Sequence, residues 1–145
     1  MKAVIQRVIA ADLKVDGKII SKIGKGYVIY LGVKKGDVKE NCDYLAKKIS
    51  ALRIFEDENG KINKSITDEN GEILLVSQFT LYANTSHGNR PDFLDAEIPQ
   101  KAEELYLYLA EQLKKTGVPV QLGVFGADMK ISQINDGPFT VIMEK

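Results

Sequence analysis

Three hydrogen-bonding side chains interrupt an otherwise apolar stretch, and they are the residues best placed to do chemistry. Residues 72–83 are rich in β-branched, aliphatic and aromatic side chains, which predicts a central buried strand. Ser77, Gln78 and Thr80 stand within it. Regular alternation would place Gln78 and Thr80 on the face opposite Ser77 and Phe79. An unpartnered buried polar group costs about 1–3 kcal/mol, so these side chains either bond to the protein or face a site.

The remaining inventory is too small for most familiar catalytic machinery. His87 is the only histidine and lies in a turn-rich loop, residues 84–98, where it is either a base or simply exposed. Cys42 is the only cysteine and falls on the apolar face of a predicted helix, so we expect it to pack in the core. The sequence lacks the ligands for a zinc site, a nucleotide-binding glycine loop and a plausible catalytic triad. We therefore expect no metal and no cofactor, and a reaction that needs little acid–base power, such as hydrolysis of an activated ester.

The composition is that of an ordinary globular protein. Of its 145 residues, 44% are apolar and 28% charged, which predicts one domain spanning residues 1–145. No apolar run approaches a membrane span and the N-terminus lacks a signal-peptide pattern, so we expect a cytoplasmic protein. The formal net charge is zero. Bulk charge thus gives no support for nucleic-acid binding, and any contact with RNA must be local or limited to the RNA's end.

The apolar patterns predict strands, turns and two helices. Residues 37–51 have helical spacing, with Asp37 as the N-cap and Glu40 as its capping-box partner, and a second helix runs from Pro99 to Gly117. The predicted strands are residues 2–10, 13–15, 18–20, 26–33, 72–83, 118–125, 128–134 and 139–144, with hairpin turns at Asp16-Gly17 and at the two Asp-Glu-Asn-Gly segments, 57–60 and 68–71. This order favours a mixed α/β domain, largely antiparallel, with two helices covering the sheet.

Five segments together resemble one known family. Ser77-Gln78-Phe79-Thr80-Leu81 is followed near the C-terminus by Asn135-Asp136-Gly137-Pro138-Phe139-Thr140, and residues 3–8, 53–57 and 125–129 complete the set. This combination resembles the D-aminoacyl-tRNA deacylases over essentially the whole chain. The resemblance implies a compact three-layer β/β/α fold and a homodimer. It also implies an enzyme of translation proofreading that hydrolyses the ester bond of D-aminoacyl-tRNA, releasing D-amino acid and tRNA.

The resemblance also implies roles for the first motif. Ser77, Gln78, Phe79 and Thr80 would line the pocket around the ester, with backbone N–H groups near Phe79 and Thr80 holding the developing oxyanion. Thr80 would act as a nucleophile or only position water. The terminal 2′-hydroxyl of the tRNA is the alternative activating group, and we favour it because no side-chain base is evident for Thr80.

The second motif is implied to be a chirality filter. In the family the bond equivalent to Gly137-Pro138 is cis, and its two carbonyls accept the substrate's α-ammonium and block an L side chain. The motif enters the active site of the other subunit, so a dimer is part of the mechanism. A glycyl ester has no side chain to exclude and is expected to be cleaved too. In isolation, Gly-Pro would predict only a trans turn before a last strand.

Three further residues are implied to bind substrate or support the filter. Arg7 would brace the Gly137-Pro138 loop, or would otherwise be a surface arginine. Phe125 and Met129 would sandwich the terminal adenine, or would otherwise be plain core. Two other functions stay open: a catalytically inactive module of the same fold that binds aminoacyl-tRNA or an RNA end, and an esterase acting on small molecules.

Overall fold

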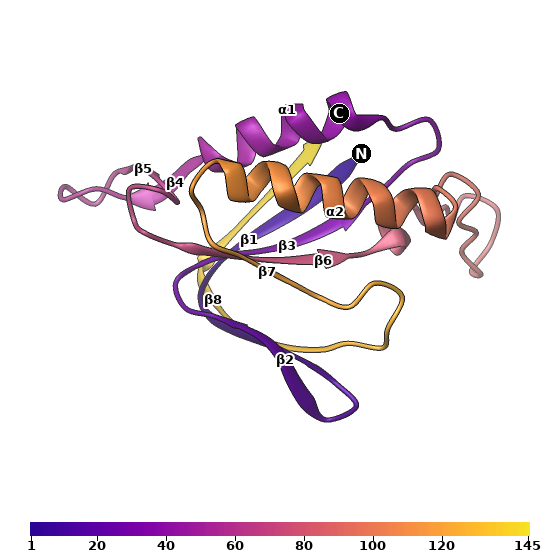
Figure 1. The fold of residues 1–145 in the computed structure, drawn as a ribbon, viewed down its shortest axis with the longest axis horizontal. Helices are drawn as coiled ribbons and strands as arrows, with labels where there is room; N and C mark the ends of the chain where they lie inside the picture. The colour runs from indigo at the N-terminus through magenta and orange to yellow at the C-terminus, as the bar shows by residue number, and fades with distance from the viewer.

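A sheet of six strands carries the fold (Figure 1). The computed structural model describes the whole chain, from Met1 to Lys145. The strands lie in the order β2-β1-β3-β6-β7, with β8 also paired to β1. Their bounds are β1 Lys2–Val15, β2 Lys18–Ile23, β3 Gly26–Gly32, β6 Glu72–Ser77, β7 Val120–Leu122 and β8 Lys130–Glu144. Only the β3–β6 and β6–β7 pairs are parallel, so the sheet is mixed and largely antiparallel, as the sequence predicts.

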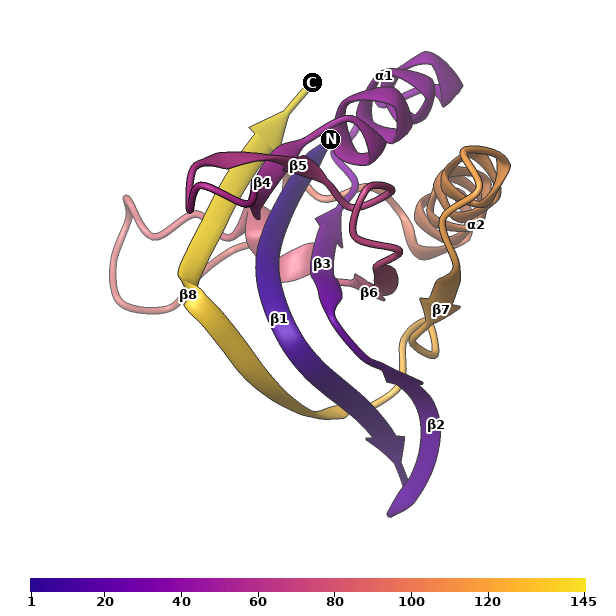
Figure 2. The same ribbon diagram turned by 90° about the vertical axis from the view of Figure 1, so that its left-hand side faces the viewer.

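Two helices, α1 (Lys39–Ser50) and α2 (Pro99–Lys115), cover one face of this sheet (Figures 1 and 2). Their apolar stripes form the main core, where Leu45 and Leu109 pack with Ile29 and Leu75 of the sheet. Cys42 is fully buried there, which confirms its expected packing role, and burial raises the pKa of its thiol to about 12. Neither helix combines the length and apolarity needed to cross a membrane.

The long antiparallel pair of β1 and β8 curls away from the helices (Figure 2). As a result, Leu13 of β1 and Ile23 of β2 pack on the sheet face that the helices leave free, against Val28 and Leu74. The centre of the sheet is thus buried on both faces, which accounts for the near-continuous apolar runs in β3 and β6. The expected α/β domain with three layers and two helices is confirmed.

The β1–β2 hairpin forms at the predicted turn. Asp16 and Gly17 both have positive φ, at 50° and 77°, which is the conformation that matches the twist of the flanking strands. The first strand is longer than expected, because residues 2–10 and 13–15 belong to one strand, β1.

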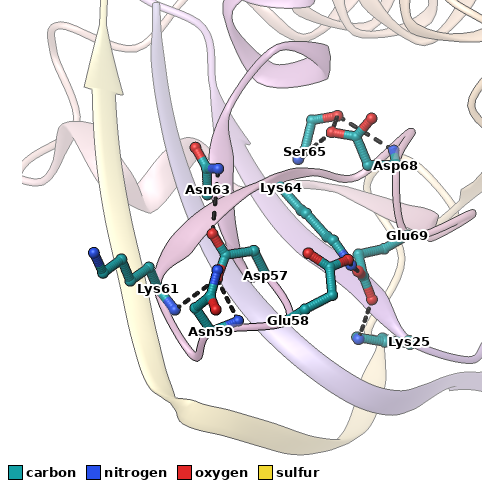
Figure 3. Close-up of polar contacts among 10 residues, drawn as sticks. All are labelled: Lys25, Asp57, Glu58, Asn59, Lys61, Asn63, Lys64, Ser65, Asp68 and Glu69. Atoms are coloured by element: carbon teal, nitrogen blue, oxygen red, sulfur yellow. Dashed lines mark hydrogen bonds and ion pairs between the residues drawn. The ribbon is translucent and has the colours of Figure 1, made fainter.

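A separate two-stranded sheet lies beside the main one, formed by β4 (Arg53–Glu56) and β5 (Ile62–Ser65). Its turn is the first Asp-Glu-Asn-Gly segment, in which Asp57 Oδ1 accepts the N–H groups of Asn59 at 2.9 Å and Lys61 at 3.0 Å (Figure 3). The second such segment, residues 68–71, does not close a hairpin, since it joins β5 to β6 in the other sheet. The same four residues form a turn in both places, but they do not determine whether the strands on either side pair with each other.

Ion pairs attach this second turn to the hairpin (Figure 3). Lys64 Nζ lies 2.7 Å from a carboxylate oxygen of Glu58 and 3.6 Å from one of Glu69, and Lys25 also binds Glu69. These lysines lower the pKa of both carboxyl groups. Pairs near the surface each contribute little to stability, so the role of this cluster is local, between the second turn and the hairpin.

The predicted start of the first helix was wrong in its capping residues. Asp37 and Glu40 do not form a capping box; instead the Val38 N–H donates to Asn41 Oδ1 at 2.9 Å. Asp37 is buried and accepts a hydrogen bond from the N-terminal ammonium of Met1 at 2.8 Å. Asp37, which local spacing predicts to be the helix cap, therefore forms a tertiary ion pair instead.

The predicted strand over residues 72–83 ends early. β6 stops at Ser77, and a 3₁₀ helix, η1 (Phe79–Tyr82), follows. Both neighbours run out here: the β7 register reaches only Leu75, and β3 ends at Gly32, over which Leu81 packs. With no strand left to pair with, the backbone turns into a helix, so alternation of faces beyond Ser77 does not apply.

The C-terminal strands also differ from the prediction. The strand expected at 118–125 shortens to β7. The two expected at 128–134 and 139–144 join into β8, which passes through Gly137-Pro138 without a chain reversal. Pairing with β1 on both sides of this point holds both halves in one sheet.

Candidate active site

The first motif borders a pocket of about 290 Å³ at the carboxyl end of β6. One wall is Val76, Ser77, Gln78 and Phe79, where the strand passes into η1. The other wall comes from the segment that leads into β8, with Gly126, Ala127, Asp128 and Met129, and from Ile131 at the start of β8 itself. The pocket thus joins two of the predicted motifs, which lie far apart in the sequence.

The strand-to-helix junction leaves backbone donors outside the sheet ladder. The Gln78 N–H still bonds to the sheet, donating to the Leu31 carbonyl at 2.8 Å. Phe79 and Thr80 then open η1, and the first N–H groups of a helix have no partner within it. The Leu81 N–H is the first to be satisfied locally, by the Gln78 carbonyl. Two adjacent N–H groups, one on the pocket wall at Phe79 and the next beside it at Thr80, are suited to bind a negatively charged oxygen.

The side chains of this junction form a small polar pair. Gln78 Nε2 donates a hydrogen bond to Thr80 Oγ1, and Thr80 is exposed. No carboxylate, imidazole or amine bonds to the Thr80 hydroxyl. His87 is exposed in the loop after η1. The structure therefore places Ser77, Gln78 and Phe79 on the pocket and Thr80 next to them, but it does not give Thr80 a base.

The two residues expected to hold an adenine divide between pocket and core. Met129 lines the pocket, and its Sδ lies so close to Gly123 that a Cβ there would be 2.8 Å away. Phe125 packs against Tyr106 of α2, with ring centroids 6.0 Å apart, at the edge of the main core. Only Met129 faces the same space as Ser77 and Phe79.

Gly137-Pro138 lies in a bulge of β8 and its peptide bond is cis. Gln6 pairs with Thr140 and Val8 with Asn135, so the four residues 136–139 lie opposite the single residue Arg7. Such bulges redirect a short segment out of the ladder. Gly137 has a φ of 120°, and a Cβ on it would lie 3.0 Å from the Phe139 nitrogen.

The side chain of Arg7 contacts this bulge. The residue is 6% exposed, so it is not a surface arginine. The guanidinium reaches Asp136, and a Cβ on Gly137 would lie 3.2 Å from Arg7 Nη2. Arg7 is thus in direct contact with the Gly137-Pro138 segment.

The two halves of the predicted site do not meet within one chain. Arg7 pairs with Tyr27, and Tyr27 with Ile73, which puts the bulge level with the start of β6. Ser77 is four residues further along β6, or roughly 13 Å, and β8 is three strand spacings away, or roughly 14 Å. Measured along the sheet, these two offsets put Ser77 and the Gly137-Pro138 bulge roughly 19 Å apart, and no residue of the bulge lines the pocket.

Some residues at these places carry no sequence signal of their own. Val76 and Ile131 line the pocket but have the pattern of ordinary apolar positions. Asp128 lies inside the segment 125–129, so only its place in that motif points to it. Gln133 contacts Gln6 beside the bulge, and a lone glutamine on a strand gives no warning of that contact.

The chain is similar to known proteins along almost its whole length. The D-Tyr-tRNA(Tyr) deacylase family matches residues 4–144. A D-aminoacyl-tRNA deacylase of Geotalea daltonii is 54% identical over 99% of this chain and 96% of its own length. The corresponding protein of Limosilactobacillus reuteri is 51% identical over the full length of both chains, and that of Aquifex aeolicus is 49% identical over 99% of this chain and 97% of its own.

Two solved structures share the fold. One, described as a c-Myc DNA unwinding element binding protein, is 44% identical, with a TM-score of 0.94 over 100% of this chain and 99% of its own. The other, described as a probable eukaryotic D-amino acid tRNA deacylase, is 17% identical, with a TM-score of 0.80 over 98% and 97% of the two chains. At that identity the second match supports the fold alone.

Proposed function

The chain belongs to the D-Tyr-tRNA(Tyr) deacylase family, a family of hydrolases, and from this premise we propose that it hydrolyses the ester bond of D-aminoacyl-tRNA. Water adds to the ester carbonyl, the bond to the terminal ribose oxygen breaks, and D-amino acid and tRNA are released. The pocket beside Ser77, Gln78 and Phe79 is the observation that carries the proposal. Full-length identity near half with D-aminoacyl-tRNA deacylases supports it.

The pocket fits the chemistry of an activated ester. The N–H groups of Phe79 and Thr80 would stabilise the oxyanion, and a donor of this kind can lower the barrier by roughly 3–4 kcal/mol. Ser77 and Gln78 would orient the ester against them. Met129 would pack on the terminal adenine, with Phe125 behind it at the edge of the core. No metal or cofactor is needed for this reaction.

We assign activation of the attacking water to the tRNA's terminal 2′-hydroxyl rather than to Thr80. Thr80 Oγ1 accepts a hydrogen bond from Gln78 and has no base beside it to take its proton. A hydroxyl nucleophile without an adjacent base is weak near neutral pH. Thr80 then serves to hold Gln78 in place at the pocket.

We propose that a homodimer completes the site, with Gly137-Pro138 of one copy entering the pocket of the other and rejecting L-aminoacyl esters. The separation of the two motifs within one chain supports this. So does the free edge of β8, fifteen residues long, which exposes Ile134 and Ile142 at 60% and 64%. Long apolar strand edges favour pairing with another chain. Glycyl-tRNA, with no side chain to exclude, would also be hydrolysed, as part of translation proofreading in the cytoplasm.

The decisive experiment compares deacylation of D-tyrosyl-tRNA and L-tyrosyl-tRNA by the wild type and by Gly137→Ala. We expect rapid loss of only the D-ester by the wild type, and damaged selectivity or rate in the variant, because the new Cβ crowds Phe139 and Arg7. Gly88→Ala is the matched control, since Gly88 has a similar φ of 122° but open space around it.

The other outcomes point to different functions. If the wild type cleaves neither ester but binds tRNA, the chain is an inactive RNA-end binding module of the same fold. If small esters are cleaved without any tRNA 3′ end, it is a small-molecule esterase. If both tyrosyl esters are cleaved equally, the ester chemistry stands and the filter is wrong.

A further inference from the structure

A chain of amide side chains lies at the neck of the β8 bulge. Gln133 Nε2 donates to Gln6 Oε1 at 2.7 Å and to Asn135 Oδ1 at 2.6 Å. Gln6 Nε2 in turn lies 3.4 Å from Thr140 Oγ1, and the hydroxyl of Tyr30 donates to Gln133 Oε1 at 3.1 Å. These contacts join three strands, β1, β3 and β8.

The position of this chain matters because the ladder fails there. Asn135 and Thr140 are the last residues of β8 in register with β1 on either side of the bulge. Between them, four residues face Arg7 alone, so regular backbone pairing cannot fix their position. The Gln6 and Gln133 amides link Asn135 on one side of the bulge to Thr140 on the other, and so close its neck.

The amides and the arginine act from opposite faces of the sheet. Gln6 and Arg7 are consecutive in β1, so their side chains point to opposite faces. Arg7 holds the bulge at Asp136 on the helix side. The half-buried Gln6 and Gln133 hold it on the other side, where Tyr30 anchors them to β3.

We infer that Gln6 and Gln133 are positioning residues that fix where the bulge presents Gly137-Pro138, and so set the discrimination between D- and L-aminoacyl esters. This role rests on the proposed function. Neither side chain lies in the pocket beside Ser77, so their effect passes through the bulge. Removing one of these amides should make the position of Gly137-Pro138 less well defined and leave the residues that line the pocket unchanged.

The test replaces Gln133 by Met, which keeps the length of the side chain and removes its donors and acceptor. We expect the ratio of D- to L-tyrosyl-tRNA deacylation to fall about tenfold, the effect of losing a hydrogen bond at a critical place. Gln121→Met is the matched control, because Gln121 is an exposed glutamine on β7, and it should leave the ratio unchanged. Gln6→Met should resemble Gln133→Met, whereas Gln6→Glu, which keeps the acceptor for Gln133, should recover most of the ratio.

Hydrogen–deuterium exchange of residues 135–140 gives a readout that does not need activity. In Gln133→Met we expect faster exchange in this segment and unchanged exchange around the pocket. If both the ratio and the exchange match the wild type while the melting temperature falls, the amides are only structural and the inference is overturned. If the wild type cleaves neither ester, the proposed function fails, and the exchange data alone decide whether the amides hold the bulge.

Discussion

The guanidinium of Arg7 binds Asp136 at two atoms: its Nε lies 3.2 Å from the Asp136 carbonyl oxygen and 3.1 Å from Oδ2. Nη1 of the same side chain donates to the Ile54 carbonyl at 2.6 Å. The ring of Phe139 lies 5.2 Å from the guanidinium carbon. The buried side chain of Arg7, on β1, therefore connects the bulge of β8 to β4.

Arg7→Met should destabilise the protein and damage discrimination between D and L esters. The substitution leaves the Ile54 carbonyl and the Asp136 carboxylate without their partner, at a cost of about 2–3 kcal/mol by urea unfolding. Arg7→Lys should recover only part of this, because an ammonium lacks the planar fork that reaches both groups. Lys2→Met is the control: Lys2, on the same strand as Arg7, pairs with the exposed Glu144 of β8, and its loss should cost less than about 1 kcal/mol. Equal losses for Arg7 and Lys2 would contradict the bracing role.

A tRNA ending in 2′-deoxyadenosine should be deacylated at least about 100-fold more slowly than normal D-tyrosyl-tRNA, a loss typical of a missing acid–base group. Thr80→Val, which removes the hydroxyl and keeps the shape, should slow the reaction by less than about tenfold, because only the hydrogen bond from Gln78 is lost. Single-turnover rates on both substrates measure this. A large loss in Thr80→Val with full activity on the deoxy substrate would make Thr80 the nucleophile.

The Cys42 thiol should not react with a thiol reagent in the folded protein at about pH 8. Burial raises its pKa to about 12, and the thiolate is the reactive form. Its Sγ also packs 3.5 Å from the Leu105 carbonyl oxygen of α2. Labelling with a chromogenic disulfide should therefore appear only in denaturant, with the same midpoint as global unfolding. Fast labelling of the native protein would mean that the contact between α1 and α2 opens locally.

Local pattern predicted the elements of the sheet well and their ends poorly. The apolar runs in β3 and β6 reveal burial on both faces, because the positions between the strand ends are all apolar or aromatic. The end of β6 at Ser77 depends instead on where β7 and β3 stop, and neither limit is visible in residues 72–83. Asp37 is a similar case. Its partner, the N-terminal ammonium of Met1, is far away in the sequence, so the residues around Asp37 do not reveal the ion pair.

The site shows the same division. Motif resemblance pointed to Ser77 and Gly137-Pro138, but not to how far apart one chain holds them. That separation follows from the register of four strands, which no single segment encodes. In the bulge, four residues of β8 lie opposite the single residue Arg7. This number follows from the pairs on either side of the bulge and cannot be read from the sequence of β8 alone. The contacts of Gln133 escape sequence reasoning for the same reason, since strand register sets its neighbours.

Asp57→Ala should lower the melting temperature at neutral pH, and this difference from the wild type should shrink in acid. Hydrogen bonds from the N–H of Lys61, then from that of Asn59, lower the pKa of Asp57 below its ordinary value of 3.8. A carboxyl group whose pKa is lower in the folded state stabilises it fully above the unfolded pKa and loses this effect as pH falls through the folded pKa. The gap between wild type and variant should thus be constant from about pH 5 to 7 and narrow below about pH 3.8. Asn59→Ala keeps the backbone donors of the turn and should show a gap that does not change with pH; a constant gap for Asp57→Ala as well would mean that the charge of its carboxylate does not hold the β4–β5 turn.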